Sequence, residues 1–183
     1  MSSTIGVQNI AHTNGTNAIT VASDGGVYIK DAVIQVVNHQ DSQQAVGTAI
    51  IPNDDSIPQK TEGTEFMTLS ITPKSATSKL LIQVVVSSTA SSNNALNISA
   101  LFKNDETNAI ATTGQYQHIG TGIMTTTYSH YITAGTTSSI TFRVRGGAST
   151  GNYTFNGYHH NGILYRNFGG SSASSMTIME IGG

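Results

Sequence analysis

The 183-residue sequence contains no cysteine, so it can form neither a disulfide framework nor a thiolate metal site. Charge is also scarce. Asp, Glu, Lys and Arg make up 10% of the chain, against roughly 25% in ordinary globular proteins. The net charge is −2 and no basic stretch stands out, so we do not expect nucleic acid to be a partner.

Long apolar runs are missing too. The densest run, around Val84 to Val86, is far shorter than the roughly 18–20 residues that span a bilayer. The opening MSSTIGVQNI has neither the basic start nor the apolar stretch of a secretory signal. We therefore expect no membrane insertion. We also expect that any extracellular location is reached by another route, such as virion assembly followed by lysis.

Strand signals fill the chain, and no long segment has the 3.6-residue apolar period of a helix. Alternating apolar residues occur at Leu80, Ile82, Val84 and Val86, at Leu96, Ile98, Ala100 and Phe102, and at Ile140, Phe142 and Val144. Period-2 alternation predicts that each of these sets faces a core. Further strands are expected near 32–38, 44–51, 65–72, 108–112, 115–119, 122–133, 152–157 and 174–182. Turn dipeptides such as Asn93-Asn94 and Asn104-Asp105 separate the runs, which predicts an all-β sandwich or barrel.

Some predicted strands are apolar on both faces, notably 32–37 and 176–181. A strand of this kind must be covered on both sides. The second cover is either a neighbouring subunit or a loop or N-terminal segment of the same chain, and the sparse charge favours the subunit. The interface candidates are Val33, Val37, Leu81, Val85, Met179 and Ile181.

Residues 1–30 differ from the remainder. They predict two short β segments around Asn14-Gly15 and Asp24-Gly25-Gly26, because Asn-Gly and Asp-Gly are strong hairpin signals. A two-stranded piece alone is marginal in water. We therefore expect this segment to pack on the main domain, to intertwine with copies of itself, or to dock into a larger particle. The predicted division is an attachment segment, 1–30, and a head domain, 31–183.

Three stretches resemble a known group of proteins. VQNIAHTNGTNAITVASDGGV resembles a segment that precedes terminal domains in tail fibres and virion proteins of marine and cyanobacterial phages. FMTLSITPKSATSKLLIQVVVS and SSMTIMEIGG resemble phage jelly-roll domains, which are similar in design to the trimeric tumour-necrosis-factor and complement heads. The resemblance implies an antiparallel jelly-roll sandwich, a homotrimer on a virion surface, and contact with other virion proteins through residues 1–30.

Enzyme chemistry is not expected. The sequence has no Gly-x-Ser-x-Gly elbow and no phosphate-binding loop ending in Gly-Lys-Ser or Gly-Lys-Thr. Glycan cleavage would need two positioned carboxylates, and the candidates Asp54, Asp55, Asp105 and Glu106 are interpreted as solvated turn residues. No cofactor is expected.

Two further features are singled out. Glu180 follows Met176 and Ile178 in register, so we expect it to be semi-buried and hydrogen-bonded, or ion-paired with Lys79, Arg143 or Arg145. His159 and His160 are weak metal candidates, because adjacent strand residues point to opposite faces and side-by-side histidines in a Gly/Asn-rich loop are usually polar surface.

Residues 156–168 combine aromatic faces with planar amide and guanidinium donors, a mixture that suits sugar rings. The glycan candidates are Tyr158, Tyr165, Arg166, Phe168, Asn156 and Asn161. Alternatively these residues pack between subunits or over the sandwich edge. The overall prediction is a non-enzymatic, homotrimeric structural protein of a phage particle: a head fibre, a decoration or cement protein, or a fibre head. The alternative is the receptor-binding tip of a tail fibre that recognises a host-surface glycan.

Overall fold

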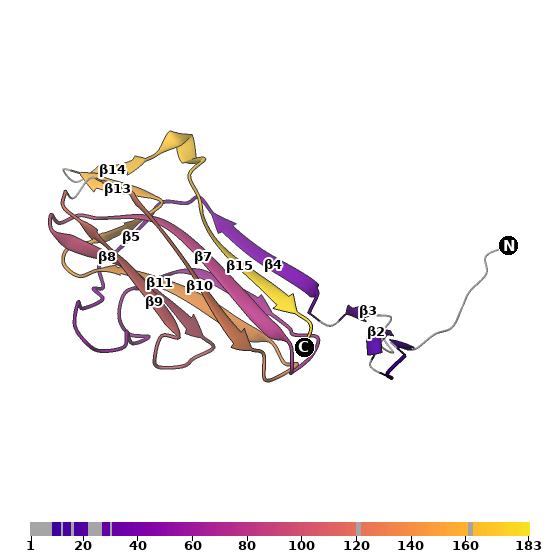
Figure 1. The fold of residues 1–183 in the computed structure, drawn as a ribbon. Coiled ribbons are helices and arrows are strands. Elements are labelled where there is room, and N and C mark those ends of the chain that lie inside the picture. The colour runs from indigo at the N-terminus through magenta and orange to yellow at the C-terminus, as the bar shows by residue number, and fades with distance from the viewer. Residues whose placement is uncertain are drawn as a thin grey trace.

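The computed structural model describes residues 9–11, 13–15, 17–21, 27–29, 31–119, 122–160 and 163–183. Its regular structure is strand, apart from one short 3-10 turn at Phe168–Gly170. The described residues therefore confirm the all-β prediction (Figure 1).

Two antiparallel sheets pack face to face. The first has the order β4 (Val33–Asp41), β15 (Ser174–Ile181), β7 (Lys79–Ala90) and β10 (Met124–Thr133). The second has the order β6 (Thr64–Ile71), β11 (Ile140–Ala148), β8 (Ala95–Lys103) and β9 (Ala111–Gln117). The chain passes repeatedly from one sheet to the other, which is the eight-stranded jelly-roll arrangement and confirms the predicted fold class. Two short strands, β5 (Ala45–Gly47) and β12 (Tyr153–Phe155), extend the first sheet at the C-terminal end of β7.

The core between the sheets follows the period-2 pattern on β7 and β11. The β7 set of Leu80, Ile82, Val84 and Val86 is buried against the β11 set of Ile140, Phe142 and Val144. Both sets confirm the sequence prediction, because alternate residues of a strand point to opposite faces of its sheet.

Strand β8 also alternates, but its apolar set joins a different core. Its alternating set Leu96, Ile98, Ala100 and Phe102 faces away from the first sheet and packs with Ile51 in a separate small core. The polar residues between them point into the sandwich instead, where Asn97 donates to Gln117 and Ser99 pairs with the Tyr128 hydroxyl. The apolar set of β8 therefore faces a core, as predicted, but this is a second core, which the segment before β6 covers.

Two predicted strands near 108–112 and 115–119 form a single strand, β9, with Gly114 in its middle. Asn108 makes only an isolated bridge to Gln59. The predicted strand at 44–51 is shorter than expected, because pairing in β5 ends at Gly47. The residues that follow cross the outside of the second sheet.

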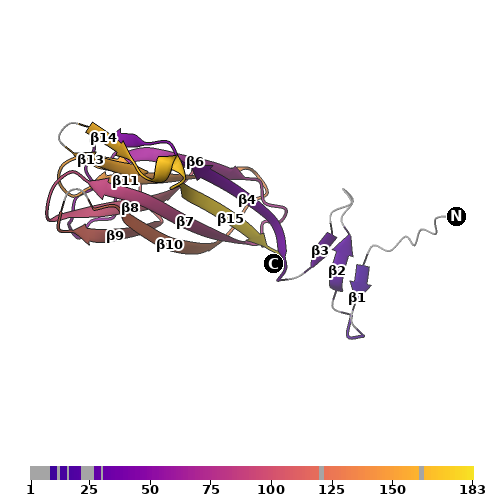
Figure 2. The ribbon, with the colours of Figure 1, turned by 90° about the horizontal axis from the view of Figure 1, so that it is seen from above.

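The N-terminal strands β1 (Asn9–Ala11), β2 (Asn17–Val21) and β3 (Val27–Ile29) form a small sheet of their own (Figure 2). Asn14-Gly15 lies in the β1–β2 turn, as predicted, whereas Asp24-Gly25-Gly26 lies outside the described residues. The sandwich begins beside its own last strand, where the Asp31 amide donates to Gly182 and the Gly182 amide donates to Ala32. The division at residue 30 stays a prediction.

Candidate functional site

The outward face of the first sheet carries an apolar row that crosses all four strands. Strand register places Val36 of β4, Met179 of β15, Leu81 of β7 and Tyr131 of β10 side by side. We call these four residues the outer row. The row is open at both ends, where Val36 is 54% exposed and Tyr131 is 56% exposed. Figure 1 shows the four strands lying next to one another.

The neighbouring row on the same face extends the apolar surface. Val33 lies beside Ile181, and Ile181 lies beside Lys79, whose ammonium group donates to the Thr133 hydroxyl. Val33 is 54% exposed. Lys79 is the one charged side chain at the outward-facing paired positions of these strands. Covering this face would therefore remove few charges from water.

The register of the paired strands shows toward which face each predicted interface residue points. Those that face outward are Val33, Leu81, Val85, Met179 and Ile181. Val37 does not, because it lies opposite the buried Ile178 and packs against the main core. That part of the prediction is wrong, and Val36 takes its place. Whether any of these residues contacts another subunit stays a prediction.

A β-bulge explains the exchange between Val36 and Val37. The pairing shifts between Glu180 and Ile181, so that Ile181 lies opposite Val33 while Glu180 lies opposite Gln35. One extra β4 residue, Ile34, is accommodated there. Val33 and Val36 therefore share the outward face although they are three residues apart. Strict alternation from Val33 would have placed Val37 there, and the sequence pattern carries no signal for the bulge.

The predicted glycan segment is a hairpin formed by β13 (Gly157–His160) and β14 (Ile163–Arg166), and it lies at the end of the sandwich away from the C-terminus (Figure 1). Tyr158 and Tyr165 are cross-strand partners. Their rings stack, with centroids 4.8 Å apart and an interplanar angle of 8°. One face of each ring is thus occupied by the other. Phe168, just beyond the hairpin, is 82% exposed and has a φ of 48°.

Asn156 is a structural residue, and its prediction as a ligand contact is wrong. It is only 2% exposed. Its Nδ2 donates to the carbonyl groups of Asp41 and Gln43, and its Oδ1 accepts from Ser174. These bonds satisfy a buried amide and tie the start of the hairpin to β4 and β15.

Several other candidates can be placed only in part. Asn161 lies outside the described residues, as do the side chains of His159 and His160. Within the part of the chain that the structure describes, no three His, Cys, Asp or Glu residues come together to hold a metal ion. In that same part, no helix is long and apolar enough to cross a membrane.

The carboxylates singled out in the sequence take part in local contacts. Asp54 accepts hydrogen bonds from the backbone amide and the hydroxyl of Ser56, and these bonds lower the pKa of Asp54. Asp105 pairs with Lys60 at 2.9 Å, and this lysine lowers the pKa of Asp105. Both side chains belong to turns at the surface of the domain.

Glu180 is completely buried and hydrogen-bonded. Its Oε1 accepts from the backbone amides of Lys74 and Ser75 at 2.8 and 3.3 Å, and its Oε2 accepts from Gln35 Nε2 at 2.5 Å. The hydrogen-bonded role is confirmed. The ion-paired alternative is wrong, because Lys79 is bound to Thr133 while Arg143 and Arg145 lie beside Glu65.

The strand topology defines the class of the protein, which is an antiparallel jelly-roll domain. No protein-family model matches the chain, and no curated protein matches it.

Solved structures with a similar strand arrangement include three of different kinds. The EclA C-terminal domain, a sugar-binding protein, has a TM-score of 0.37 and 16% identity, covering 74% of this chain and 84% of that chain. Eiger TNF from S. frugiperda has a TM-score of 0.43 and 10% identity, covering 79% and 92%. The infectious bursal disease virus Gt strain has a TM-score of 0.39 and 12% identity, covering 86% of this chain and 40% of that chain. At these identities and TM-scores the likenesses concern the fold alone.

Proposed function

We propose that the chain is a structural jelly-roll head of a phage particle and that it works as a homotrimer through the outward face of its first sheet. The observation that supports this is the outer row. Four apolar side chains lie in register across four strands, and the flanking residues Val33 and Ile181 widen the patch. Monomeric proteins rarely leave a contiguous apolar surface of this kind open to water.

The energetics of such an association follow from the composition of the face. Burying apolar surface stabilises a contact by about 25 cal/mol per Å². Little charge would lose its hydration here, because Lys79 is the one outward-facing charge at the paired positions of these strands. The hydroxyl and amide side chains that surround the outer row would need hydrogen-bond partners across the contact. The four strands span a flat footprint of roughly 600 Å² at standard strand spacing and rise. This is of the same order as the roughly 800 Å² that each partner buries in a stable interface.

The number of subunits and the phage assignment rest on a different argument. Both come from resemblance. Residues 7–27 resemble a segment that precedes terminal domains in phage tail fibres and virion proteins, and residues 66–87 and 174–183 resemble phage jelly-roll domains. The proposal places the head on the virion surface, with residues 1–30 meeting other virion proteins. Labelling intact particles with gold-conjugated antibody against the head domain should mark the capsid or the tail, and unlabelled particles would contradict the assignment.

The oligomer is tested by placing a charge in the outer row. Leu81→Lys should convert a species of three times the 19.2 kDa chain mass into a folded monomer, because an unpaired ammonium group cannot be buried at an apolar contact. Light scattering coupled to size exclusion measures the mass, and circular dichroism confirms folding. Ser70→Lys is the matched control: Ser70 is exposed on the other sheet, so this variant should keep the wild-type mass. A wild-type protein that is monomeric at micromolar concentration would refute the proposal.

A second candidate function is glycan recognition by a fibre tip, favoured by the stacked tyrosines and the exposed Phe168. Arg166, also exposed, lies two residues before Phe168. If this hairpin binds host glycan, Phe168→Ala and Arg166→Ala should each reduce adsorption to host cells. Both variants should keep the wild-type oligomeric mass, whereas Leu81→Lys should change that mass. Unchanged adsorption of both hairpin variants would exclude this site.

A further inference from the structure

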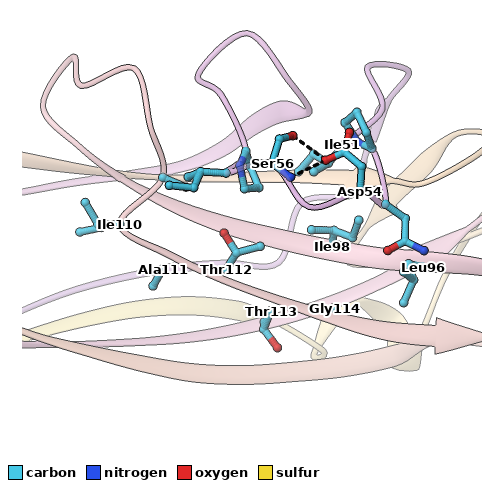
Figure 3. Close-up of a pocket in the computed structure, with 15 residues that line it drawn as sticks. Ile51, Asp54, Ser56, Leu96, Ile98, Ile110, Ala111, Thr112, Thr113 and Gly114 are labelled. Atoms are coloured by element: carbon cyan, nitrogen blue, oxygen red, sulfur yellow. Dashed lines mark hydrogen bonds between the residues drawn. The ribbon is translucent and has the colours of Figure 1, made fainter.

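A groove lies on the outside of the second sheet, between segment 51–58 and strands β8 and β9 (Figure 3). It has a volume of about 580 Å³. This face is distinct from the outer row, which belongs to the first sheet, and from the hairpin. The groove therefore belongs to one subunit and needs no neighbour to complete it.

Gly114 forms part of the groove floor, and its own backbone does not require glycine. Its φ lies outside the left-handed range, and a Cβ atom at this position would meet Ile98 Cγ1 at 3.5 Å, which is an ordinary contact. Glycine in the middle of a strand weakens it, and often marks a place where a ligand approaches the backbone. Gly114 lies opposite Ile98, between Thr112 and Tyr116 on the same face of β9. The missing side chain thus leaves the floor open.

The walls combine aliphatic surface with neutral polar groups. Leu96 and Ile98 form the apolar base, and Pro52 and Ile57 line the opposite side. Figure 3 shows the Thr112 hydroxyl on the side of strand β9 that faces segment 51–58.

The charge of the lining limits what can bind. Among the residues that the structure describes, Asp54 is the one charged residue of the lining, and no Lys or Arg lines the groove. Oδ1 of Asp54 accepts hydrogen bonds from Ser56, so Oδ2 is the carboxylate oxygen that remains to accept from a ligand. An anionic ligand would meet this carboxylate without a compensating cation, so the lining disfavours anions. It favours a ligand that is neutral and carries several hydroxyl donors.

We propose that this groove binds a neutral saccharide. The C–H face of a sugar ring would lie on Gly114, Leu96 and Ile98, and its hydroxyl groups would bond to Asp54, Asn53 and Thr112. A mixture of apolar wall and a few convergent polar groups is the usual composition of small-ligand sites. The volume accommodates a short oligosaccharide unit with one side open to solvent.

The test fills the floor without touching the polar groups. Gly114→Val adds a β-branched side chain that suits a strand, so the variant should melt at the same temperature as the wild type or higher. It should nevertheless weaken saccharide binding by tenfold or more, which corresponds to about 1.4 kcal/mol. The matched control is Gln115→Val, because residue 115 is exposed, adjoins Gly114 and points to the other face of β9. This control should bind like the wild type.

The probe is an immobilised array of neutral hexose and N-acetylhexosamine oligosaccharides, with sialylated glycans beside them, applied to the full-length chain. Binding to neutral members that is lost in Gly114→Val and kept in Gln115→Val supports the site. Three results would overturn it: no neutral glycan bound, a preference for sialylated glycans, or wild-type binding by Gly114→Val. If Phe168→Ala loses glycan binding while Gly114→Val keeps it, recognition lies on the hairpin instead.

Discussion

Removal of the Glu180 carboxylate should destabilise the sandwich more than any surface change. Glu180 is completely buried and accepts from two backbone amides and one side-chain amide. Hydrogen bonds to a charged group contribute about 1.5–3 kcal/mol each, and a buried donor left unpaired costs about 1–3 kcal/mol. The bonds share one acceptor group and are not additive, so we expect Glu180→Ala to lose about 3–5 kcal/mol of unfolding free energy.

Glu180→Gln separates this cause from loss of packing. The amide has nearly the same shape, and its oxygen can still accept from Lys74 and Ser75. Gln35 can turn its own oxygen toward the new NH₂ group, but it then loses the hydrogen bond that its Nε2 donates to the Thr72 carbonyl. The expected loss is therefore only about 1 kcal/mol. Urea unfolding at one fixed protein concentration measures both variants, since association would otherwise shift the midpoint. A Glu180→Ala loss below about 1 kcal/mol, or equal losses in the two variants, would refute the reasoning.

Two further predictions concern aromatic residues. Burial raises the pKa of Tyr128 above its usual value of 10, and the unfolded chain ionises this phenol near pH 10. The contribution of Tyr128 to the unfolding free energy should therefore be complete below about pH 10 and fall as the pH rises further. Tyr128→Phe should reduce this alkaline loss when the unfolding free energy is measured by denaturant titration at several pH values. An unchanged dependence of the unfolding free energy on pH would contradict this prediction. Phe168 holds a left-handed φ at an 82% exposed position, so Phe168→Gly should raise the unfolding free energy by up to about 1 kcal/mol, and a lowered melting temperature would disprove the strain.

The strand pattern alone predicted the main core because β7 and β11 alternate cleanly between apolar and polar residues. On β8 the pattern did not indicate which core the apolar set joins, and the reason is physical. Alternation shows which residues share a face, but not which face meets the other sheet. Asn97 and Ser99 turn inward because Gln117 and Tyr128 offer hydrogen bonds there, and Ile51 covers the opposite side. These partners are distant in sequence, so a local pattern contains no information about them.

The candidate surfaces were predictable to a similar degree. The doubly apolar strands predicted that this sheet has an apolar outward face, yet the bulge at Ile34 places Val36 there in place of Val37. Nothing in the sequence indicated that Tyr131 belongs to the outer row, because its place there follows from the pairing of β10 with β7. Asn156 resembled a surface amide in the sequence, whereas its positive φ and buried bonds make it part of the frame. The predicted strands near 108–112 and 115–119 left Gly114 between them, whereas the structure pairs Gly114 with Ile98 inside β9.

The paired bonds between Asp31, Ala32 and Gly182 have a mechanical consequence. Tension applied through the N-terminal segment enters the sandwich at β4 and runs along that strand. Because the ladder bonds of β4 and β15 lie across the strands, such a pull loads them together in shear instead of opening them one by one. If the head is anchored through its N-terminal segment, a detaching force would therefore have to break the hydrogen bonds between β4 and β15 together.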